Sequence, residues 1–483
     1  MMSQLINAWH GNVIDDTEHM NAAIFWQEVE RLATHLRHIN PRCVALELDN
    51  SIAWLVADFA LMQAGIVSIP LPHFFSTQQR QHALQKAQPG LLIRTLDDHN
   101  PADHLWQIGQ QRLAIEVLEY DPENPRASFA QGTQKITFTS GSTGHPKGVC
   151  LSAQQLLQVA ASLVTRCGQT NPVHLCLLPL AVLLENVAGV YAPMLAGGTV
   201  HVPSLASLGF DGTALTEPHK LLATVTTVQS NTLILVPELL KGLVLACESG
   251  WQPPSSLQFI AVGGAKVAPE LIVRARALGL PVYQGYGLSE AGSVVSLADS
   301  SSNDIASVGT PLDHVEYEIV DDELVIKSPK FLGYLGDAAQ SQHVDNGGYQ
   351  TGDRVSLENG ELHIRGRIKN QIILSNGRNV SPEWPESLLL SNSALSQAVV
   401  VGEGEANLCA LIYCHPNLSD EQLQAVVNAT NTQLPCYAQI ANFMRLSAPL
   451  SIAQDYLSAN QRPKRDAINH GFADQISQLF QEL

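Results

Sequence analysis

Charged side chains are scarce in this chain, and the basic ones are fewer than the acidic ones. Only 15% of its 483 residues are Asp, Glu, Lys or Arg, and 45 acidic residues against 27 basic ones give a formal net charge of -18. Because phosphate backbones select basic surfaces, this balance argues against nucleic acid as the main partner. A nucleotide site with a locally positive lining is still compatible with it.

The sequence also lacks a long apolar run. Its most apolar stretch, Cys176 to Leu184, is interrupted by Glu185 and Asn186 and is far shorter than a membrane span. Residues 1–16 contain no cationic segment followed by an apolar block, so a secretory signal is not expected. We therefore expect a soluble, cytoplasmic protein with no transmembrane segment.

Paired cysteines at metal-ligand spacing are missing as well. The eight cysteines are scattered, and the nearest approach to a cluster, Cys409, Cys414 and His415, has no second pair. A metal-thiolate site is therefore not expected. Most of the others lie in apolar surroundings that are typical of small core residues.

An alternation of strands and helices is what the first 290 residues do contain. Val44–Leu48 and Ile66–Pro70 are strand-like, and Ile52–Ala64 between them has apolar residues at helical spacing. The hydrophobic fraction of 45% and the chain length predict a folded protein of two or three domains. Alternation of this kind predicts parallel sheets covered by helices.

The pattern changes after the polar segment 299–304. Turn residues at Asp321-Asp322 and Asn359-Gly360 stand between strand-like runs and predict antiparallel hairpins. From about Gly366 a smaller α+β unit follows, in which Ser419 with Gln422 three residues later predicts a capped helix start.

The segment 136–148 says most about function. It reads Ile-Thr-Phe-Thr-Ser-Gly-Ser-Thr-Gly-His-Pro-Lys-Gly. The glycines allow the backbone to approach a ligand closely, the hydroxyls offer donors to anionic oxygens, and Lys147 adds a compact positive charge, a combination that suits a polyphosphate. It is not a Walker loop, because Pro146 stands where that motif has glycine. Taken alone, the segment also fits a Gly/Ser-rich surface loop.

Two shorter segments suit the other parts of Mg-ATP. In Tyr283-Gln-Gly-Tyr-Gly-Leu-Ser-Glu290, an aromatic ring before a glycine can stack on a purine, and Glu290 can hold Mg²⁺. In Tyr349-Gln-Thr-Gly-Asp353, the aspartate can accept both hydroxyls of a ribose. Residues 287–291 also approach the nucleophile elbow of serine hydrolases, but they end in Ala291 and no partner histidine is identifiable, so a hydrolase is the weaker alternative.

In this order, these segments resemble the motifs of the ANL superfamily of adenylate-forming enzymes, and the chain is most similar to the AMP-forming fatty acyl-CoA synthetases. The superfamily includes acyl-CoA synthetases, peptide-synthetase adenylation domains and luciferases. Further stretches carry the same resemblance: Gly366–Asn370 to the interdomain hinge, Leu374–Glu383 to the loop that enters the site for thioester formation, and Leu178–Glu185 to the substrate-gating motif.

The resemblance implies an α/β fold in two parts. A large N-terminal adenylation domain, residues 1–366, would hold two parallel-type α/β subdomains and a β-rich subdomain. A small, mobile α+β C-terminal domain, residues 367–483, would follow.

The resemblance also implies a role for each motif residue. The residues that would contact ATP are Thr139, Ser140, Gly141, Ser142, Thr143, Gly144, Gly285, Tyr286, Gly287, Asp353 and Arg367. The catalytic group would be Lys147, Ser289, Glu290 and Arg462, with Glu290 also the metal ligand. The acyl pocket would include Val182, Gly263, Gly264 and Ala265, with Lys369 as the hinge and Gly377 in the thiol tunnel.

Two motifs depart from the family pattern. In Leu457–Arg465, Arg462 takes the place of the usual adenylation lysine and Gln461 that of the glycine before it. Arg462 keeps the charge but has a wider fork, so three interpretations stay open: Arg462 acts, Lys464 acts after a register shift, or the step is impaired. At the gating motif, Val182 replaces a histidine or aromatic residue, which makes the pocket mouth more apolar and favours a lipid-like acyl chain.

The resulting hypothesis is an ATP-dependent acid–thiol ligase. It would use ATP and Mg²⁺ to convert a carboxylic acid, of medium or long chain, to acyl-AMP, and would transfer the acyl group to CoA. One alternative acceptor is the phosphopantetheine of an acyl-carrier protein. A second alternative, motivated by Arg462 and Gln461, is a catalytically impaired, nucleotide-binding regulatory relative.

Overall fold

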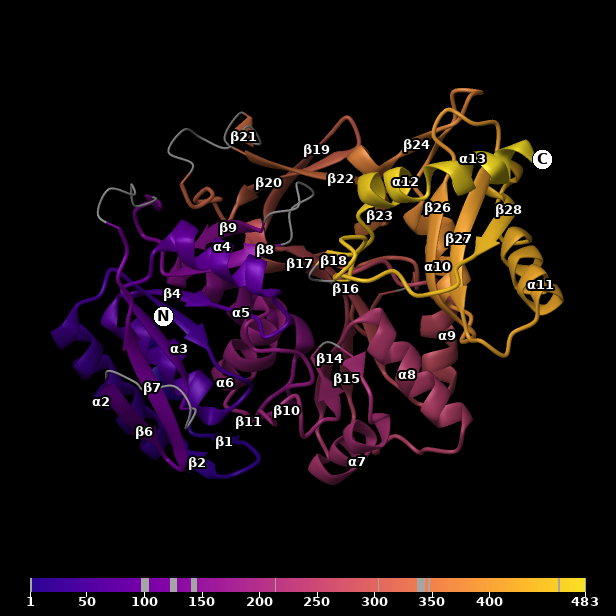
Figure 1. The fold of residues 1–483 in the computed structure, drawn as a ribbon. Coiled ribbons are helices and arrows are strands. Elements are labelled where there is room, and N and C mark those ends of the chain that lie inside the picture. The colour runs from indigo at the N-terminus through magenta and orange to yellow at the C-terminus, as the bar shows by residue number, and fades with distance from the viewer. Residues whose placement is uncertain are drawn as a thin grey trace.

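The fold is described by a computed structural model that covers residues 2–96, 104–121, 128–139, 146–212, 214–302, 304–336, 344–345, 348–458 and 461–482. The chain forms two large sheets, a β-rich unit and a C-terminal α/β unit (Figure 1). Within these residues, no helix combines the length and the apolar character that crossing a membrane would require.

The first sheet has seven strands. In spatial order they are β6 (His104–Ile108), β7 (Gln111–Val117), β5 (Leu91–Thr95), β3 (Cys43–Glu47), β4 (Val67–Pro70), β8 (Lys135–Thr139) and β9 (Lys147–Leu151). Its centre is parallel, as the sequence predicts, but β6, β7 and β9 pair antiparallel with their neighbours. The link between β6 and β7 is too short for a parallel crossover, which needs a dozen residues or more.

The second sheet has nine strands and shares a core with the first. In spatial order they are β18 (Thr310–Pro311), β17 (Ser293–Leu297), β16 (Val282–Leu288), β15 (Phe259–Val262), β14 (Thr232–Leu235), β10 (Val173–Leu175), β11 (Thr199–His201), β1 (Asn12–Ile14) and β2 (His19–Asn21). The stretch from β16 to β1 is parallel. One apolar core joins side chains of both sheets and of the helices between them.

The helices of the N-terminal part cover these sheets. They are α1 (Met2–Ala8), α2 (Ala22–Ile39), α3 (Ile52–Ala64), α4 (Thr77–Ala87), α5 (Ala153–Cys167), the π-helix η1 (Glu185–Tyr191), α6 (Ala192–Leu195), α7 (Pro218–Val228), α8 (Pro237–Glu248) and α9 (Pro269–Ala277). Helix α3 is apolar all round and buried, which is typical of a helix enclosed on every side. It begins at Ser51, whose hydroxyl accepts from Trp54 N, and ends at Gly65 in the left-handed conformation.

The β-rich unit confirms both predicted hairpins. It contains β19 (Glu316–Val320), β20 (Glu323–Ser328), β21 (Val344–Asp345), β22 (Gly348–Glu358) and β23 (Glu361–Arg367). Asp321 and Asp322 turn β19 into β20, and Asn359 and Gly360 turn β22 into β23. β23 ends at Arg367, and the 3-10 turn η3 (Ile368–Asn370) follows it directly.

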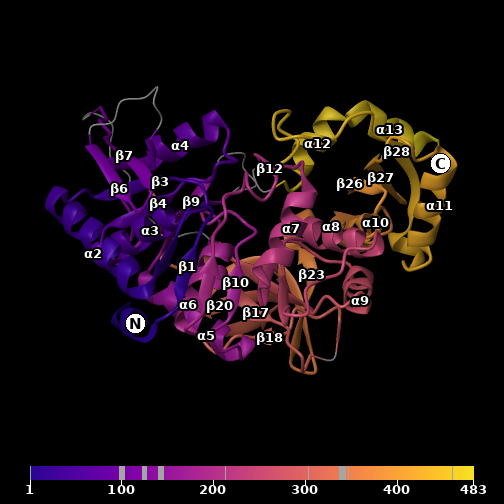
Figure 2. The same cartoon turned by 90° about the horizontal axis from the view of Figure 1, so that it is seen from below.

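The C-terminal unit is a three-stranded sheet covered on both faces. Its elements are β26 (Leu395–Val401), β27 (Leu408–Cys414), β28 (Ile440–Arg445), α10 (Glu383–Leu390), α11 (Asp420–Asn431), α12 (Arg465–Gly471) and α13 (Ala473–Gln481). Helices α10 and α11 pack on one face and α12 and α13 on the other. The predicted capping box of Ser419 and Gln422 begins α11. In both views the unit lies beside α8 and α9 (Figure 1, Figure 2).

Candidate active site

A cavity of about 2270 Å³ lies where the two sheets, the β-rich unit and the C-terminal unit meet. Its lining brings together residues that are far apart in the sequence, from Thr139 in β8 to Arg462 before α12. Most of the residues that the sequence predicts for the site line this cavity. They are Thr139, Lys147, Val182, Gly263, Gly264, Ala265, Gly285, Tyr286, Gly287, Ser289, Glu290, Asp353, Arg367, Lys369 and Arg462.

Tyr286, Asp353 and Arg367 form one polar group at the centre of the cavity. The Tyr286 hydroxyl donates to Asp353 Oδ2 at 2.6 Å, and Arg367 Nε lies 2.7 Å from Asp353 Oδ1. Burial raises the pKa of Asp353, while Arg367 and the tyrosine hydroxyl oppose that rise. The carboxylate is therefore held in place with its two oxygens on different donors.

Glu290 is held by two tyrosines. The Tyr334 hydroxyl donates to Glu290 Oε1 at 2.8 Å and lies 3.2 Å from the Tyr349 hydroxyl. Lys147 Nζ lies 5.2 Å from the centre of the Tyr334 ring, a cation–π distance. Tyr334 thus connects Lys147, at the start of β9, with the candidate metal ligand Glu290. No spacing or periodicity in the sequence marks Tyr334 as a site residue. A half-buried carboxylate is a fitting donor for Mg²⁺.

The predicted phosphate loop lies mostly outside the described residues, since Ser140–Gly144 are among the residues not covered. Its two ends are fixed, because Thr139 and Lys147 are opposite partners in the β8–β9 pairing. Lys147 is exposed at the first position of β9. Lys147 therefore lies beside Thr139, the last residue of β8, at the point where the predicted loop begins.

Arg462 crosses from the C-terminal unit to the N-terminal one. Its Nη2 donates to the carbonyl oxygen of Gly264, while Lys464 forms an ion pair with Asp455 within the C-terminal unit. The cavity walls desolvate the guanidinium and lower the pKa of Arg462, and the charge of Arg367 adds to this. Of the two cations, Arg462 is the one that reaches the N-terminal wall.

One side of the cavity, where the acyl pocket is predicted, is apolar. The lining contributed by α5, residues 177–184, η1 and α6 consists of Leu163, Val164, Cys167, Leu177, Leu178, Pro179, Ala181, Val182, Leu183, Leu184, Ala188, Ala192 and Pro193. Gly263 and Gly285 face each other closely here, since a Cβ on Gly263 would stand 3.1 Å from the Gly285 carbonyl oxygen. None of these lining side chains carries a charge.

The residues predicted for the hinge and for the thiol tunnel differ in their position relative to the cavity. Lys369 lies in η3 on the cavity wall, and burial and Arg367 lower its pKa. Gly377 is in an exposed turn with φ 76 and does not line the cavity. The structure therefore does not bring Gly377 together with the other predicted site residues.

Comparison with known proteins gives one consistent family. Residues 8–335 match the family described as AMP-binding enzyme, and residues 369–483 match the AMP-binding enzyme C-terminal domain. The chain is 24% identical to the long-chain-fatty-acid–CoA ligase FadD15 of Mycobacterium bovis, covering 88% of this chain and 86% of the relative. It is 27% identical to 2-succinylbenzoate–CoA ligase of Bacillus subtilis, covering 77% of each.

Solved structures agree on the fold. The anthranilate CoA ligase AuaEII in complex with anthranoyl-AMP matches with a TM-score of 0.80 at 16% identity, over 97% of this chain and 96% of that one. Together with the two family matches, this confirms the expected fold class and the resemblance that the motifs carry. The chain belongs to the AMP-binding enzyme family, within the ANL superfamily of adenylate-forming ligases.

Proposed function

We propose that the chain is an ATP-dependent ligase that converts a fatty acid of medium or long chain to acyl-AMP and then to acyl-CoA. The observation that carries the proposal is the contact of Arg462 with Gly264, which places a cation of the C-terminal unit on the wall shared by the polar and apolar ends of the cavity. A carboxylic acid with an apolar chain would fit this arrangement. Its carboxylate would lie at Arg462 and its chain between α5 and η1.

Each polar group would have a defined task in the first half-reaction. Asp353 would accept the two ribose hydroxyls, and Tyr286 would pack on the adenine. Arg462 and Lys147 would draw the acid and the α-phosphate together and stabilise the charge that develops as pyrophosphate leaves. Glu290 would hold Mg²⁺, which would neutralise phosphate charge when bound.

The apolar wall supports a monocarboxylic acid with a long chain over an acid with a second carboxylate. No cation is found among the lining side chains of α5, residues 177–184, η1 and α6, so a second carboxylate there would be buried without a partner. For this reason the long-chain activity in the name of FadD15 is the better guide to this chain than the 2-succinylbenzoate activity of its other relatives.

The test is substrate-dependent pyrophosphate release with Mg-ATP, over saturated fatty acids from short to long, with 2-succinylbenzoate for comparison. We expect release that peaks at one chain length and acyl-CoA as product when CoA is added. Release without transfer to CoA would indicate an acyl-carrier protein as acceptor. No release with any acid would contradict the ligase and favour the regulatory alternative.

Two variants make the assignment specific. Arg462→Ala is expected to lower the rate of adenylation by about 100-fold, because the charge at the reacting phosphate is lost. Lys464→Ala is the matched control, since it removes a neighbouring cation that pairs with Asp455, and its rate should stay within about threefold. The reverse pattern would assign the step to Lys464.

A further inference from the structure

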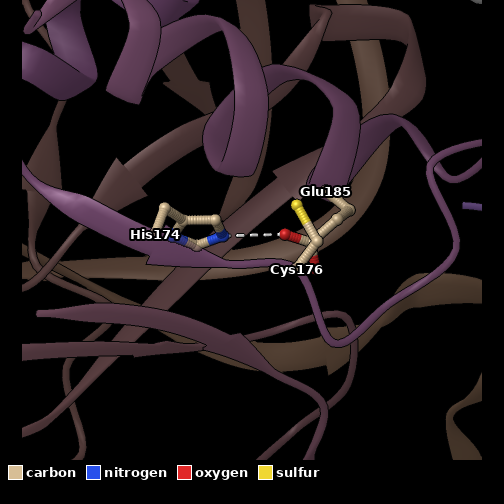
Figure 3. Close-up of side chains that lie close together, drawn as sticks. All are labelled: His174, Cys176 and Glu185. Atoms are coloured by element: carbon tan, nitrogen blue, oxygen red, sulfur yellow. Dashed lines mark hydrogen bonds and ion pairs between the residues drawn. The ribbon is translucent and has the colours of Figure 1, made fainter. Parts of the chain in front are cut away.

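A buried polar network lies next to the apolar wall of the cavity, and its His174 is itself among the lining residues; Figure 3 shows three of its side chains. His174 in β10, Cys176 just after that strand and Glu185 at the start of η1 are each no more than 1% exposed. His174 Nε2 lies 2.9 Å from Glu185 Oε1, and His174 Nδ1 lies 2.8 Å from the hydroxyl oxygen of Thr232. The second oxygen of Glu185 accepts from the amide of Leu178 at 3.0 Å.

The Leu178 amide belongs to the cavity wall itself. Residues 177–184 pass between β10 and η1, and seven of the eight line the cavity. Asn50 holds the same segment from the other side: its Nδ2 donates to the Leu178 carbonyl at 2.9 Å, and its Oδ1 accepts from the Leu180 amide at 2.8 Å. Two buried polar side chains, Glu185 and Asn50, therefore fix the backbone on which Val182 is carried.

Gly189 leaves the space that the side chains of His174 and Glu185 occupy. A Cβ on Gly189, one turn further along η1, would stand 2.0 Å from Glu185 Oε1 and 2.7 Å from His174 Nε2. Any side chain there would push the carboxylate away from both of its partners. The π-helical turn and Gly189 thus serve the placement of Glu185.

The cluster is not organised as a metal site. Both nitrogens of His174 and both oxygens of Glu185 already have partners within the network. Burial raises the pKa of Cys176 well above its usual value, which favours the thiol over the thiolate that metals bind.

We propose that His174 and Glu185 are positioning residues for the acid: through the Leu178 amide they fix the 177–184 wall and so set the affinity of the cavity for its acyl chain. This rests on the proposed function, because it takes the cavity to bind an acyl group. Neither residue would take part in proton transfer or contact ATP.

Two substitutions of Glu185 should have different effects on KM for the acid. In Glu185→Gln, the amide oxygen accepts from Leu178 and the amide NH₂ donates to His174 Nε2, if the imidazole carries its proton on Nδ1 and donates it to Thr232. In Glu185→Leu, of similar size, the Leu178 amide and the imidazole both lose their partner. We expect KM for the acid to rise by about tenfold in Glu185→Leu and to stay within about twofold in Glu185→Gln.

Two further variants separate positioning from loss of stability. Gly189→Ala removes no polar group but displaces the carboxylate, so it should raise KM for the acid as Glu185→Leu does. Tyr191→Phe is the matched control: it lies on the same helix and loses a buried hydroxyl that donates to Asp58 at 2.5 Å, away from the wall. It should lower Tm and leave KM for the acid unchanged.

The experiment measures KM for the acid, KM for ATP and kcat of pyrophosphate release in all four variants, together with hydrogen exchange of the 177–184 amides. Support is a higher KM for the acid with KM for ATP unchanged, and faster exchange of this segment in Glu185→Leu than in Glu185→Gln. Unchanged KM and exchange in Glu185→Leu, or stoichiometric zinc that Cys176→Ser removes, would overturn the inference. A wild type without acid-dependent release would instead contradict the proposed function, while the exchange data would still test the fixing of the wall.

Discussion

Gln461 has a left-handed backbone, φ 57, at the residue before Arg462. For a residue with a Cβ this conformation costs roughly 1 kcal/mol, whereas glycine adopts it freely. We expect Gln461→Gly to raise the free energy of unfolding by up to about 1 kcal/mol and to keep the rate of pyrophosphate release, since the turn that presents Arg462 is unchanged. Urea unfolding and the release assay check this. Gln461→Ala keeps the strain and is the control; a slower release in both variants would show that the Gln461 side chain itself takes part.

His314 should make the stability of the protein depend on pH in the acidic range. Neither of its ring nitrogens has a hydrogen-bond partner among the described residues, and burial lowers its pKa from 6.5 to about 4. Between these two values the unfolded chain binds more protons than the folded one, so the free energy of unfolding falls as pH drops through this window. His314→Leu should remove on the order of 1 kcal/mol of that loss, as measured by urea unfolding at several pH values. A pH dependence in His314→Leu equal to that of the wild type would contradict the role of burial.

At the scale of single residues, sequence reasoning found the groups that belong to a motif and missed those that tertiary structure supplies. Asp353 and Tyr286 were predicted, and they meet across 67 positions of the chain. Tyr334 and Glu185 were missed as functional residues, because their partners come from strands distant in sequence and no local spacing marks them. Either cation, Arg462 or Lys464, fits the pattern of the sequence, and only the three-dimensional structure shows that Arg462 contacts Gly264 while Lys464 pairs with Asp455.

At the scale of elements, the ends of α8, α9 and α10 decide how the two parts of the molecule meet. Arg274 Nη1 in α9 donates to the carbonyl of Ser391, the residue that ends α10, at 3.0 Å. Lys241 Nζ in α8 donates to the carbonyl of Leu395 at 2.6 Å. Arg274 therefore interacts with the carbonyl end of α10, where the helix dipole favours positive charge, and Lys241 interacts with the first residue of β26.

These contacts should hold the orientation in which Arg462 reaches Gly264. We expect Arg274→Met to slow pyrophosphate release by roughly threefold to tenfold, because a charged hydrogen bond across the two parts is lost, and to leave transfer from preformed acyl-AMP to CoA unaffected. The two half-reactions are measured separately. Arg276→Met is the matched control, because this arginine of the same helix donates to Val282 within its own part. Equal slowing of release in both variants would show a local effect on α9 only.

The sequence predicted the main types of secondary structure better than the antiparallel strands and the π-helix. Alternating strands and helices predicted the parallel centres of both sheets, and the turn residues predicted the hairpins of the β-rich unit. The antiparallel strands β6, β7 and β9 were not predicted, because alternation of strand and helix carries no information about strands joined by short links. The π-helix was not predicted either, since its i→i+5 bonds follow from the packing of Glu185 and Gly189 against β10 and not from a local preference.

At the scale of the whole molecule, two residues that are predicted for the same site do not lie in the cavity together. Arg462 lines the cavity, while Gly377, which the resemblance places in the thiol tunnel, lies in an exposed turn outside it. Both belong to the C-terminal unit, so bringing Gly377 to the cavity requires that unit to turn. Arg367, the last residue of β23, pairs with Asp353, and η3 with Lys369 follows it directly. We therefore expect the second half-reaction of the proposed ligase to require a backbone change near Lys369.

Lys369→Pro tests this directly. Proline fixes φ near −65°, which is within the range of a 3-10 turn, so the substitution should preserve the observed orientation and prevent its change. We expect pyrophosphate release to stay within about threefold and acyl transfer from acyl-AMP to CoA to fall by about 100-fold or more, because only the second step needs the rotation. Lys369→Ala removes the charge without restricting the backbone, so it should affect both half-reactions to a similar, small extent. If Lys369→Pro transfers the acyl group at the wild-type rate, the change of orientation does not take place at Lys369.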